Sequence, residues 1–138
     1  MKRNIVIHCS DSSWGNAAII TTWHIARQFK NIGYHFIILN GKISSTCELK
    51  GFDGGIETGR GLDEEGAHTL GANEHFGICL IGKSGKFTSK QIESCRQIIQ
   101  MLKLKYDIGE VKQHSDYDPV NKSFCAGFDA EMMQRFNT

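Results

Sequence analysis

The sequence predicts an α/β fold in which a single mixed central β-sheet has helices packed on its faces. Three apolar runs, at residues 5–7, 34–39 and 76–81, have the length and the β-branched content of buried strands. Two stretches, at residues 22–30 and 88–105, instead place their apolar side chains at helical spacing. Strands that alternate with helices in this way are typical of a sheet covered by helices.

Length and composition favour one domain. The chain has 138 residues, of which 40% are hydrophobic, so we expect a single domain over residues 1–138. The net charge of +1 gives no electrostatic reason to expect nucleic acid or an anionic membrane as a partner. No apolar run approaches the roughly 20 residues that span a bilayer, so we expect no membrane insertion.

The N-terminus and the cysteines indicate where the chain is made. Lys2 and Arg3 precede only three apolar residues before His8, too few for a signal peptide, so we expect synthesis in the cytoplasm. The five cysteines are odd in number and form no C-x-x-C pair, which argues against a disulfide framework and against a zinc ribbon.

The first half of the chain should contain two strands and a helix. Residues 4–10 predict a buried strand, and Thr21 or Thr22 can cap a helix to about Lys30, which Gly33 would stop. The strand at residues 34–39 is followed by Asn40-Gly41, a strong hairpin signal, so residues 42–46 should return beside it. Residues 47–75 are rich in glycine and predict a long irregular loop.

The second half continues the alternation. Residues 76–81 predict a central strand, and Thr88 with Gln91 forms a capping box for a helix to about Lys105. Its expected buried stripe is Ile92, Cys95, Ile99, Leu102 and Tyr106. A last short strand should begin at Val111 and a last helix should cover residues 129–135.

A candidate metal site joins both ends of the chain. His8 and His114 each close a predicted strand, and Cys125 lies in the turn-rich segment after His114. Catalytic zinc takes three such ligands and keeps one position for water, whose pKa it lowers to about 7. From the residues alone, each histidine could instead be structural and the cysteine a small hydrophobe. Asp116 or Asp118 could also replace Cys125. No H-E-x-x-H motif occurs, which excludes a thermolysin-type site.

Short motifs along nearly the whole chain resemble, in order, the type 2 family of zinc-dependent N-acetylmuramoyl-L-alanine amidases. This family includes phage lysozymes of the amidase type and the peptidoglycan recognition proteins. The motifs are V-I-H-C-S at 6–10, W-H at 23–24, G-Y-H-F-I-I at 33–38, G-R at 59–60, G-A-H-T-L-G-A-N at 66–73, F-G-I-C-L-I-G at 76–82, F-T-S-K-Q at 87–91 and H-S-D-Y-D-P-V-N-K-S-F-C-A-G-F-D at 114–129.

The resemblance implies a fold and a set of site residues. It implies the amidase and peptidoglycan-recognition-protein fold, with one zinc ion per chain bound by His8, His114 and Cys125. It places Tyr34 beside the zinc-bound water and lets Lys122 donate to the developing oxyanion, a use of fixed charge that suits amide hydrolysis. The substrate groove would be contacted by Arg60, His68 and Asn73. Many relatives continue the cysteine with proline, whereas here alanine follows it.

The implied function is hydrolysis of the amide between N-acetylmuramic acid and L-alanine of the peptidoglycan stem, as in a phage or prophage endolysin. Such an enzyme is made in the cytoplasm and acts on the bacterial cell wall, with a muramyl peptide as its substrate. Alternatives are a non-catalytic peptidoglycan-binding module or a regulator that binds phage RNA polymerase. Beside the site, we expect His24 on a helix surface and His35 pointing away from Tyr34.

Overall fold

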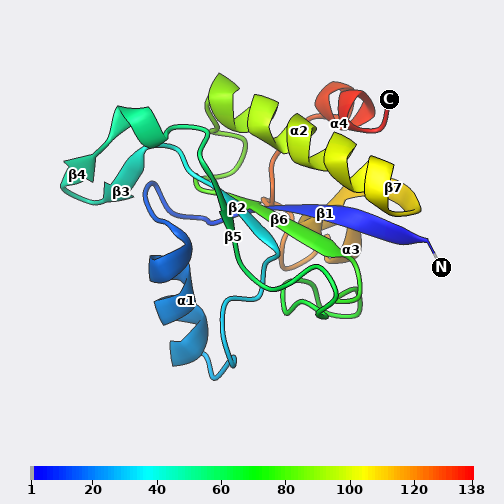
Figure 1. The fold of residues 1–138 in the computed structure, drawn as a ribbon, viewed down its shortest axis with the longest axis horizontal. Helices are drawn as coiled ribbons and strands as arrows, with labels where there is room; N and C mark the ends of the chain where they lie inside the picture. Colours follow the sequence, from blue (N-terminus) through cyan, green and yellow to red (C-terminus); the bar gives the residue numbers. More distant parts are fainter. Residues whose placement is uncertain (1) are drawn as a thin grey trace.

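A five-stranded mixed sheet forms the centre of the computed structural model, which describes residues 2–138 (Figure 1). The strand order is β5-β2-β6-β1-β7, and only the edge strand β5 runs antiparallel to its neighbour. The strands are β1 (Arg3–Cys9), β2 (Phe36–Ile38), β5 (Ile56–Thr58), β6 (Phe76–Leu80) and β7 (Ile108–Gln113). The predicted mixed sheet is confirmed, with two of the predicted apolar strands, β1 and β6, at its centre.

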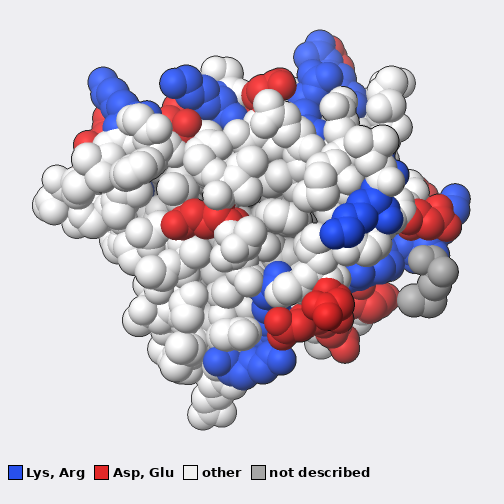
Figure 2. All heavy atoms as spheres, viewed as in Figure 1, with Lys and Arg blue, Asp and Glu red and all other residues white. Residues whose placement is uncertain are grey.

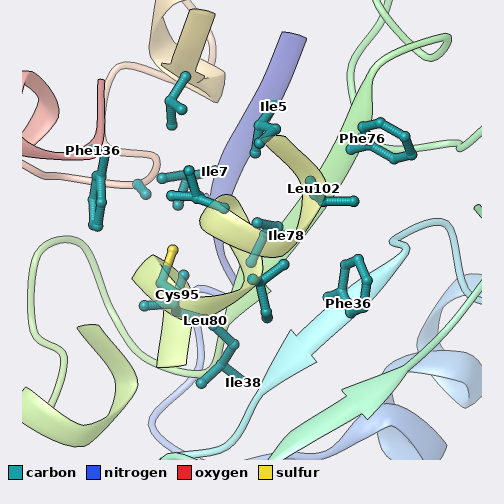
Figure 3. Close-up of a cluster of buried hydrophobic side chains, with 14 of the residues drawn as sticks. Ile5, Ile7, Phe36, Ile38, Phe76, Ile78, Leu80, Cys95, Leu102 and Phe136 are labelled. Atoms are coloured by element: carbon teal, nitrogen blue, oxygen red, sulfur yellow. The ribbon is translucent and has the colours of Figure 1, made fainter. Parts of the chain in front are cut away.

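Helices cover the two faces unequally. Helices α2 (Ser89–Lys105) and α4 (Ala130–Phe136) lie on one face, and α1 (Ala17–Ala26) lies on the other (Figure 1). The larger core fills the α2 side, where Ile5, Ile7, Phe36, Phe76, Ile78, Leu80, Cys95, Leu102 and Phe136 converge (Figure 3). A smaller core joins α1 to the opposite face. Because alternate residues of a strand face opposite sides, the same strand that buries Ile5 and Ile7 under α2 turns His8 to the α1 side.

Helix α2 follows its sequence signals closely. The Thr88 hydroxyl accepts a hydrogen bond from the Gln91 amide (3.1 Å), and the Gln91 carboxamide oxygen accepts one from the Thr88 amide (2.9 Å). The Gln91 amide group also donates to the carbonyls of Ile38 and Ile81, which ties the start of the helix to β2 and to the residue that follows β6. The capping box and the predicted span are therefore confirmed.

Helix α1 begins earlier and ends earlier than predicted. Its cap is Asn16, whose side-chain oxygen accepts a hydrogen bond from the Ile19 amide (2.9 Å). The two threonines lie inside the helix and donate to carbonyls four residues back, which satisfies their hydroxyls without capping. The helix stops at Ala26, and Gln28 takes a left-handed backbone conformation with φ of 68°.

The predicted hairpin at Asn40-Gly41 is wrong. Strand β3 (Lys42–Ser44) does not pair with β2 but forms a separate two-stranded sheet with β4 (Cys47–Glu48). The Asn40 side-chain oxygen accepts a hydrogen bond from the Lys42 amide (2.9 Å), and this local turn leads the chain away from the main sheet.

The segment 47–75 is also less irregular than predicted. It contains β4, a short 3-10 turn (Lys50–Phe52) and β5, which pairs antiparallel with β2. Strand β5 thus takes the edge position that the hairpin prediction had given to residues 42–46.

Two further features concern the surface charge and the apolar character of the helices. On the face seen in Figure 2, acidic and basic side chains are interspersed and form no single basic patch. No helix among residues 2–138 combines the length and the apolar character that crossing a membrane requires.

Candidate metal centre and active site

A cavity of about 530 Å³ lies on the α1 side of the sheet, with side chains of α1 in its lining. It lies beyond the carboxyl ends of β1 and β7, where ligands commonly bind in such sheets. Its lining combines side chains from α1, from the glycine-rich segment and from the segment after β7. These include His8, Trp23, His24, Arg27, Phe29, Tyr34, His68, Thr69, Leu70, Asn73, His114, Asp118, Lys122, Phe124 and Cys125.

Three side chains at the base of the cavity form a possible metal-binding group. His8 is the second-to-last residue of β1, His114 begins the short helix α3 (His114–Tyr117), and Cys125 lies on the following loop. One ligand atom from each lies within 4.8 Å of the others. His8 and Cys125 are almost fully buried, at 1% and 3% exposure.

The spacing of these atoms suits zinc. The Nδ1 atoms of His8 and His114 are 3.1 Å apart. Two nitrogens bound tetrahedrally at about 2.05 Å would lie about 3.3 Å apart. The backbone amide of Cys9 donates to the Cys125 sulfur (3.1 Å), which stabilises negative charge on that sulfur. The two imidazoles and the thiol could therefore serve together as three ligands of one zinc ion.

The two aspartates that could replace Cys125 have other partners. Asp116 accepts a hydrogen bond from the Gln113 amide (2.8 Å) and so caps α3. Asp118 accepts one from the Asn121 amide (3.2 Å). Neither carboxylate belongs to the group formed with His8 and His114 among the described residues.

Electrostatics keep the two imidazoles neutral. Burial is the main reason that the pKa of His8 lies well below its usual value, and His68 and His114 lower it further. Burial is also the main cause that lowers the pKa of His114, and the positive charge of Lys122 lowers it further. Neutral imidazole is the form that binds metal. The pKa of Cys125 is raised by its hydrogen bond with Cys9 and by burial, so a metal ion would have to displace the thiol proton.

Tyr34 and Lys122 line the same cavity as this group. The ring centroids of Tyr34 and His8 are 5.1 Å apart, and both Tyr34 and Lys122 line the cavity. Burial raises the pKa of Tyr34 well above its usual value, so the phenol keeps its proton and can donate a hydrogen bond. The cavity thus brings together a possible metal-binding group, a hydroxyl donor and a cationic side chain.

His24 is a cavity residue, and the prediction of a helix-surface position is wrong. It is 6% exposed, and its ring packs against Phe29 and Tyr34 at centroid distances of 5.0 and 5.3 Å. Its Nδ1 accepts a hydrogen bond from the Gly33 amide (2.9 Å), which leaves the proton on Nε2. Among the described residues, every fully buried side-chain nitrogen or oxygen has a hydrogen-bond partner. The Nε2–H of His24 has none, so it is not fully buried and is accessible from the cavity that His24 lines.

A sequence signal for His24 did exist. It stands four residues after Ile20, and the two side chains form the buried stripe of α1. Burial also lowers the pKa of His24 to about 4, so it offers a neutral donor to the cavity at neutral pH.

The three predicted groove residues separate into two sets. His68 and Asn73 line the cavity, and the Asn73 side-chain oxygen accepts hydrogen bonds from the amides of His68 and Thr69, both at 2.8 Å. Arg60 is not among the lining residues. Its guanidinium donates to the carbonyl oxygens of Ile32 and Glu65 and to the side-chain oxygen of Asn31. These bonds connect the glycine-rich segment to the residues that precede β2.

His35 is a backbone anchor. Its Nδ1 accepts a hydrogen bond from the Gly77 amide (3.0 Å) and its Nε2 donates to the Glu64 carbonyl (2.8 Å). It does not line the cavity, in agreement with the expectation that it points away from Tyr34.

Comparison with known proteins agrees with this geometry. The model of the N-acetylmuramoyl-L-alanine amidase family matches residues 2–127. The endolysin of Enterobacteria phage T3 is 32% identical over 136 residues, which cover 91% of this chain and 80% of that protein. The solved N-acetylmuramoyl-L-alanine amidase LysC from Clostridium intestinale URNW has a TM-score of 0.79 at 26% identity, covering 97% of this chain and 84% of LysC.

A more distant structure shares the fold. Peptidoglycan recognition protein-LE, solved in complex with tracheal cytotoxin, a monomeric diaminopimelic acid-type peptidoglycan, has a TM-score of 0.72 at 23% identity. The match covers 97% of this chain and 78% of that structure. The resemblance drawn from the motifs is confirmed: the chain belongs to the N-acetylmuramoyl-L-alanine amidase family.

Proposed function

We propose that this chain is a zinc-dependent peptidoglycan amidase that hydrolyses the amide between N-acetylmuramic acid and L-alanine of the stem peptide. We further propose that it acts as a phage or prophage endolysin on the bacterial cell wall and that residues 1–138 form one catalytic domain. The observation that carries the zinc proposal is the group of His8, His114 and Cys125, whose ligand atoms meet at the base of a cavity.

The side chains around that group suit the chemistry of amide hydrolysis. A zinc ion held by the three ligands would activate water and polarise the carbonyl of the scissile amide. The ammonium group of Lys122 lines the same cavity and can stabilise the negative charge that the carbonyl oxygen gains. The protonated phenol of Tyr34 can donate a hydrogen bond at the reacting centre.

The rest of the cavity suits a muramyl peptide. Its volume of about 530 Å³ lies within the roughly 300–1,000 Å³ that is typical of small-ligand sites. The Nε2–H of His24 offers a fixed donor for a substrate carbonyl, and Trp23 and Phe29 supply apolar surface. The chain has all three candidate zinc ligands, His8, His114 and Cys125, and this favours catalysis over recognition of peptidoglycan without cleavage.

The test is digestion of purified peptidoglycan combined with metal analysis. We expect one zinc ion per chain and release of stem peptides with a new N-terminal L-alanine, identified by mass spectrometry. Chelation should stop the release and added zinc should restore it. The His114→Ala variant is the control, because it removes one ligand and should bind no zinc. Release of reducing sugar ends without stem peptides that begin with L-alanine would refute the amidase assignment, and unchanged activity after chelation would refute the role of zinc.

A further inference from the structure

Both ring nitrogens of His8 are engaged, and they face opposite sides of the ring. Its Nδ1 lies toward the metal-binding group, 3.1 Å from Nδ1 of His114. Its Nε2 lies away from that group, 2.9 Å from Nδ1 of His68. The two side chains come from segments 60 residues apart in sequence, and the His68 contact is buried. His68 therefore stands directly behind a proposed metal ligand.

The hydrogen bonds of His68 determine which nitrogen carries each proton. Its Nε2 lies 2.9 Å from the backbone carbonyl oxygen of His75, and a carbonyl can only accept, so Nε2 carries the proton. No hydrogen bond of the described residues joins His68 to a carboxylate, so the buried ring is neutral and its Nδ1 is an acceptor. His8 then donates through Nε2–H, which leaves its Nδ1 with a free lone pair directed at the metal-binding group.

Thr69 completes this arrangement. Its hydroxyl lies 2.8 Å from Nδ1 of His68 and 3.2 Å from Nε2 of His8. The hydroxyl can donate to the first nitrogen while its oxygen accepts from the second, which is compatible with the same proton positions.

The His68 ring packs closely against the backbone of Gly77 and Gly66. A Cβ atom added to Gly77 would stand 2.7 Å from Cδ2 of the ring, and one added to Gly66 would overlap the same atom. The backbone amide of His68 is fixed by Asn73 (2.8 Å). An acceptor held this firmly can orient the ring of His8 as well as select its tautomer.

We propose that His68 is a positioning residue, which holds His8 as the Nε2–H tautomer and directs its Nδ1 toward the metal ion. This differs from the substrate contact that the sequence motifs suggested for His68. The inference rests on the proposed zinc site. Partners of this kind behind a metal ligand contribute about 10- to 100-fold to metal affinity.

Two conservative variants separate this role from a merely structural one. In His68→Asn, the amide oxygen can occupy the place of Nδ1 and still accept from His8, while the bond to the His75 carbonyl is lost. In His68→Gln, the amide nitrogen can occupy the place of Nε2 and keep the bond to that carbonyl, while the acceptor for His8 is lost. The two variants therefore keep opposite halves of the His68 hydrogen bonds.

The first measurement is zinc affinity by competition with a chromophoric chelator. We expect His68→Gln and His68→Ala to bind zinc about 10- to 100-fold more weakly than the wild type, and His68→Asn to recover most of the loss. A loop-anchoring role predicts the reverse order. Affinity of His68→Gln equal to that of the wild type, or of His68→Asn equal to that of His68→Ala, would overturn the inference.

The second measurement needs no metal and no activity. Long-range ¹⁵N–¹H correlation spectra of the metal-free protein report which nitrogen of His8 carries the proton. We expect Nε2–H in the wild type and in His68→Asn. A wild-type His8 protonated on Nδ1 would overturn the inference even if zinc binds. A wild type with the expected tautomer that takes up no zinc would instead overturn the proposed zinc site.

Discussion

Mild acid should destabilise the metal-free protein, because its cavity depends on buried histidines that remain neutral. Burial lowers the pKa of His68 to about 3 and that of His24 to about 4. In an unfolded chain each would titrate near its usual value of about 6.5. Below that value, the unfolded state therefore binds protons that the folded state excludes.

The sign and the size follow from these two pKa values. Since both folded pKa values are depressed, the stability linked to them is complete above pH 6.5 and is lost as the pH falls. At pH 5, each group costs about 1.36 kcal/mol multiplied by roughly 1.5 pH units, or about 2 kcal/mol. The pair therefore removes at most about 4 kcal/mol between pH 7 and pH 5, a large part of the 5–15 kcal/mol that is typical of small domains.

The assay is urea unfolding at pH 5, 6 and 7 with a chelator present, so that metal binding does not contribute. His68 and His24 should together account for about 2–4 kcal/mol of the unfolding free energy that the wild type loses from pH 7 to pH 5. His8, whose pKa is also lowered by burial, adds to that loss. In His24→Gln this loss should shrink by about 1–2 kcal/mol, because one of the two groups is gone. Thr22→Ala, on the same helix, removes no titratable group and should leave the loss unchanged.

Two results would refute this reasoning. One is an unfolding free energy that is the same at pH 5 and pH 7. The other is a His24→Gln variant with the full wild-type loss, since that would mean that His24 is protonated in the folded state or reaches solvent freely.

Three further predictions test other parts of the molecule. Lys122→Ala should keep its zinc but hydrolyse peptidoglycan about 100- to 1,000-fold more slowly, as measured by metal content and stem-peptide release; full activity would remove Lys122 from the reaction. Gly77→Ala should lower stability by about 1–3 kcal/mol and weaken zinc binding, because the new methyl group meets the His68 ring; urea unfolding and chelator competition measure the two effects. Asn137→Ala should cost about 1–3 kcal/mol in urea unfolding, since its carboxamide pairs with both the amide (2.8 Å) and the carbonyl (2.9 Å) of Val111 at the free edge of β7; no change would mean that water replaces both bonds.

The parts of the fold that the sequence predicted correctly depend on local interactions. The capping box of Thr88 and Gln91 joins residues three apart, so the start of α2 is readable without knowledge of the rest of the chain. The apolar run at residues 76–81 is buried on both faces, so its place at the sheet centre follows from composition. His8 and His114 were predicted at strand ends, and the parallel pairing of β1 with β7 brings them together.

The errors occurred where distant contacts decide the local structure. Asn40-Gly41 is a strong hairpin signal, but Asn40 uses its side chain to turn the chain away, and β5 takes the place beside β2. Nothing within residues 47–75 marks residues 56–58 as a strand, because their pairing partner lies about 20 residues earlier. Thr21 and Thr22 predict too late a start for α1, because threonine is a common cap but these two hydroxyls bond within the helix.

The histidines show why the site could be found from sequence but not fully interpreted. Every histidine has two nitrogens, and its role depends on what each one meets. At His35 both meet backbone groups, so the ring only holds the sheet to the loop. At His24 one meets the Gly33 amide and the other is left for the cavity, whereas at His68 one meets a carbonyl and the other meets His8. Most of these partners lie far along the chain, so local sequence gives the residue type without its role. A motif can therefore nominate His8 as a ligand, whereas the nitrogen that would bind a metal ion follows only from the folded contact with His68.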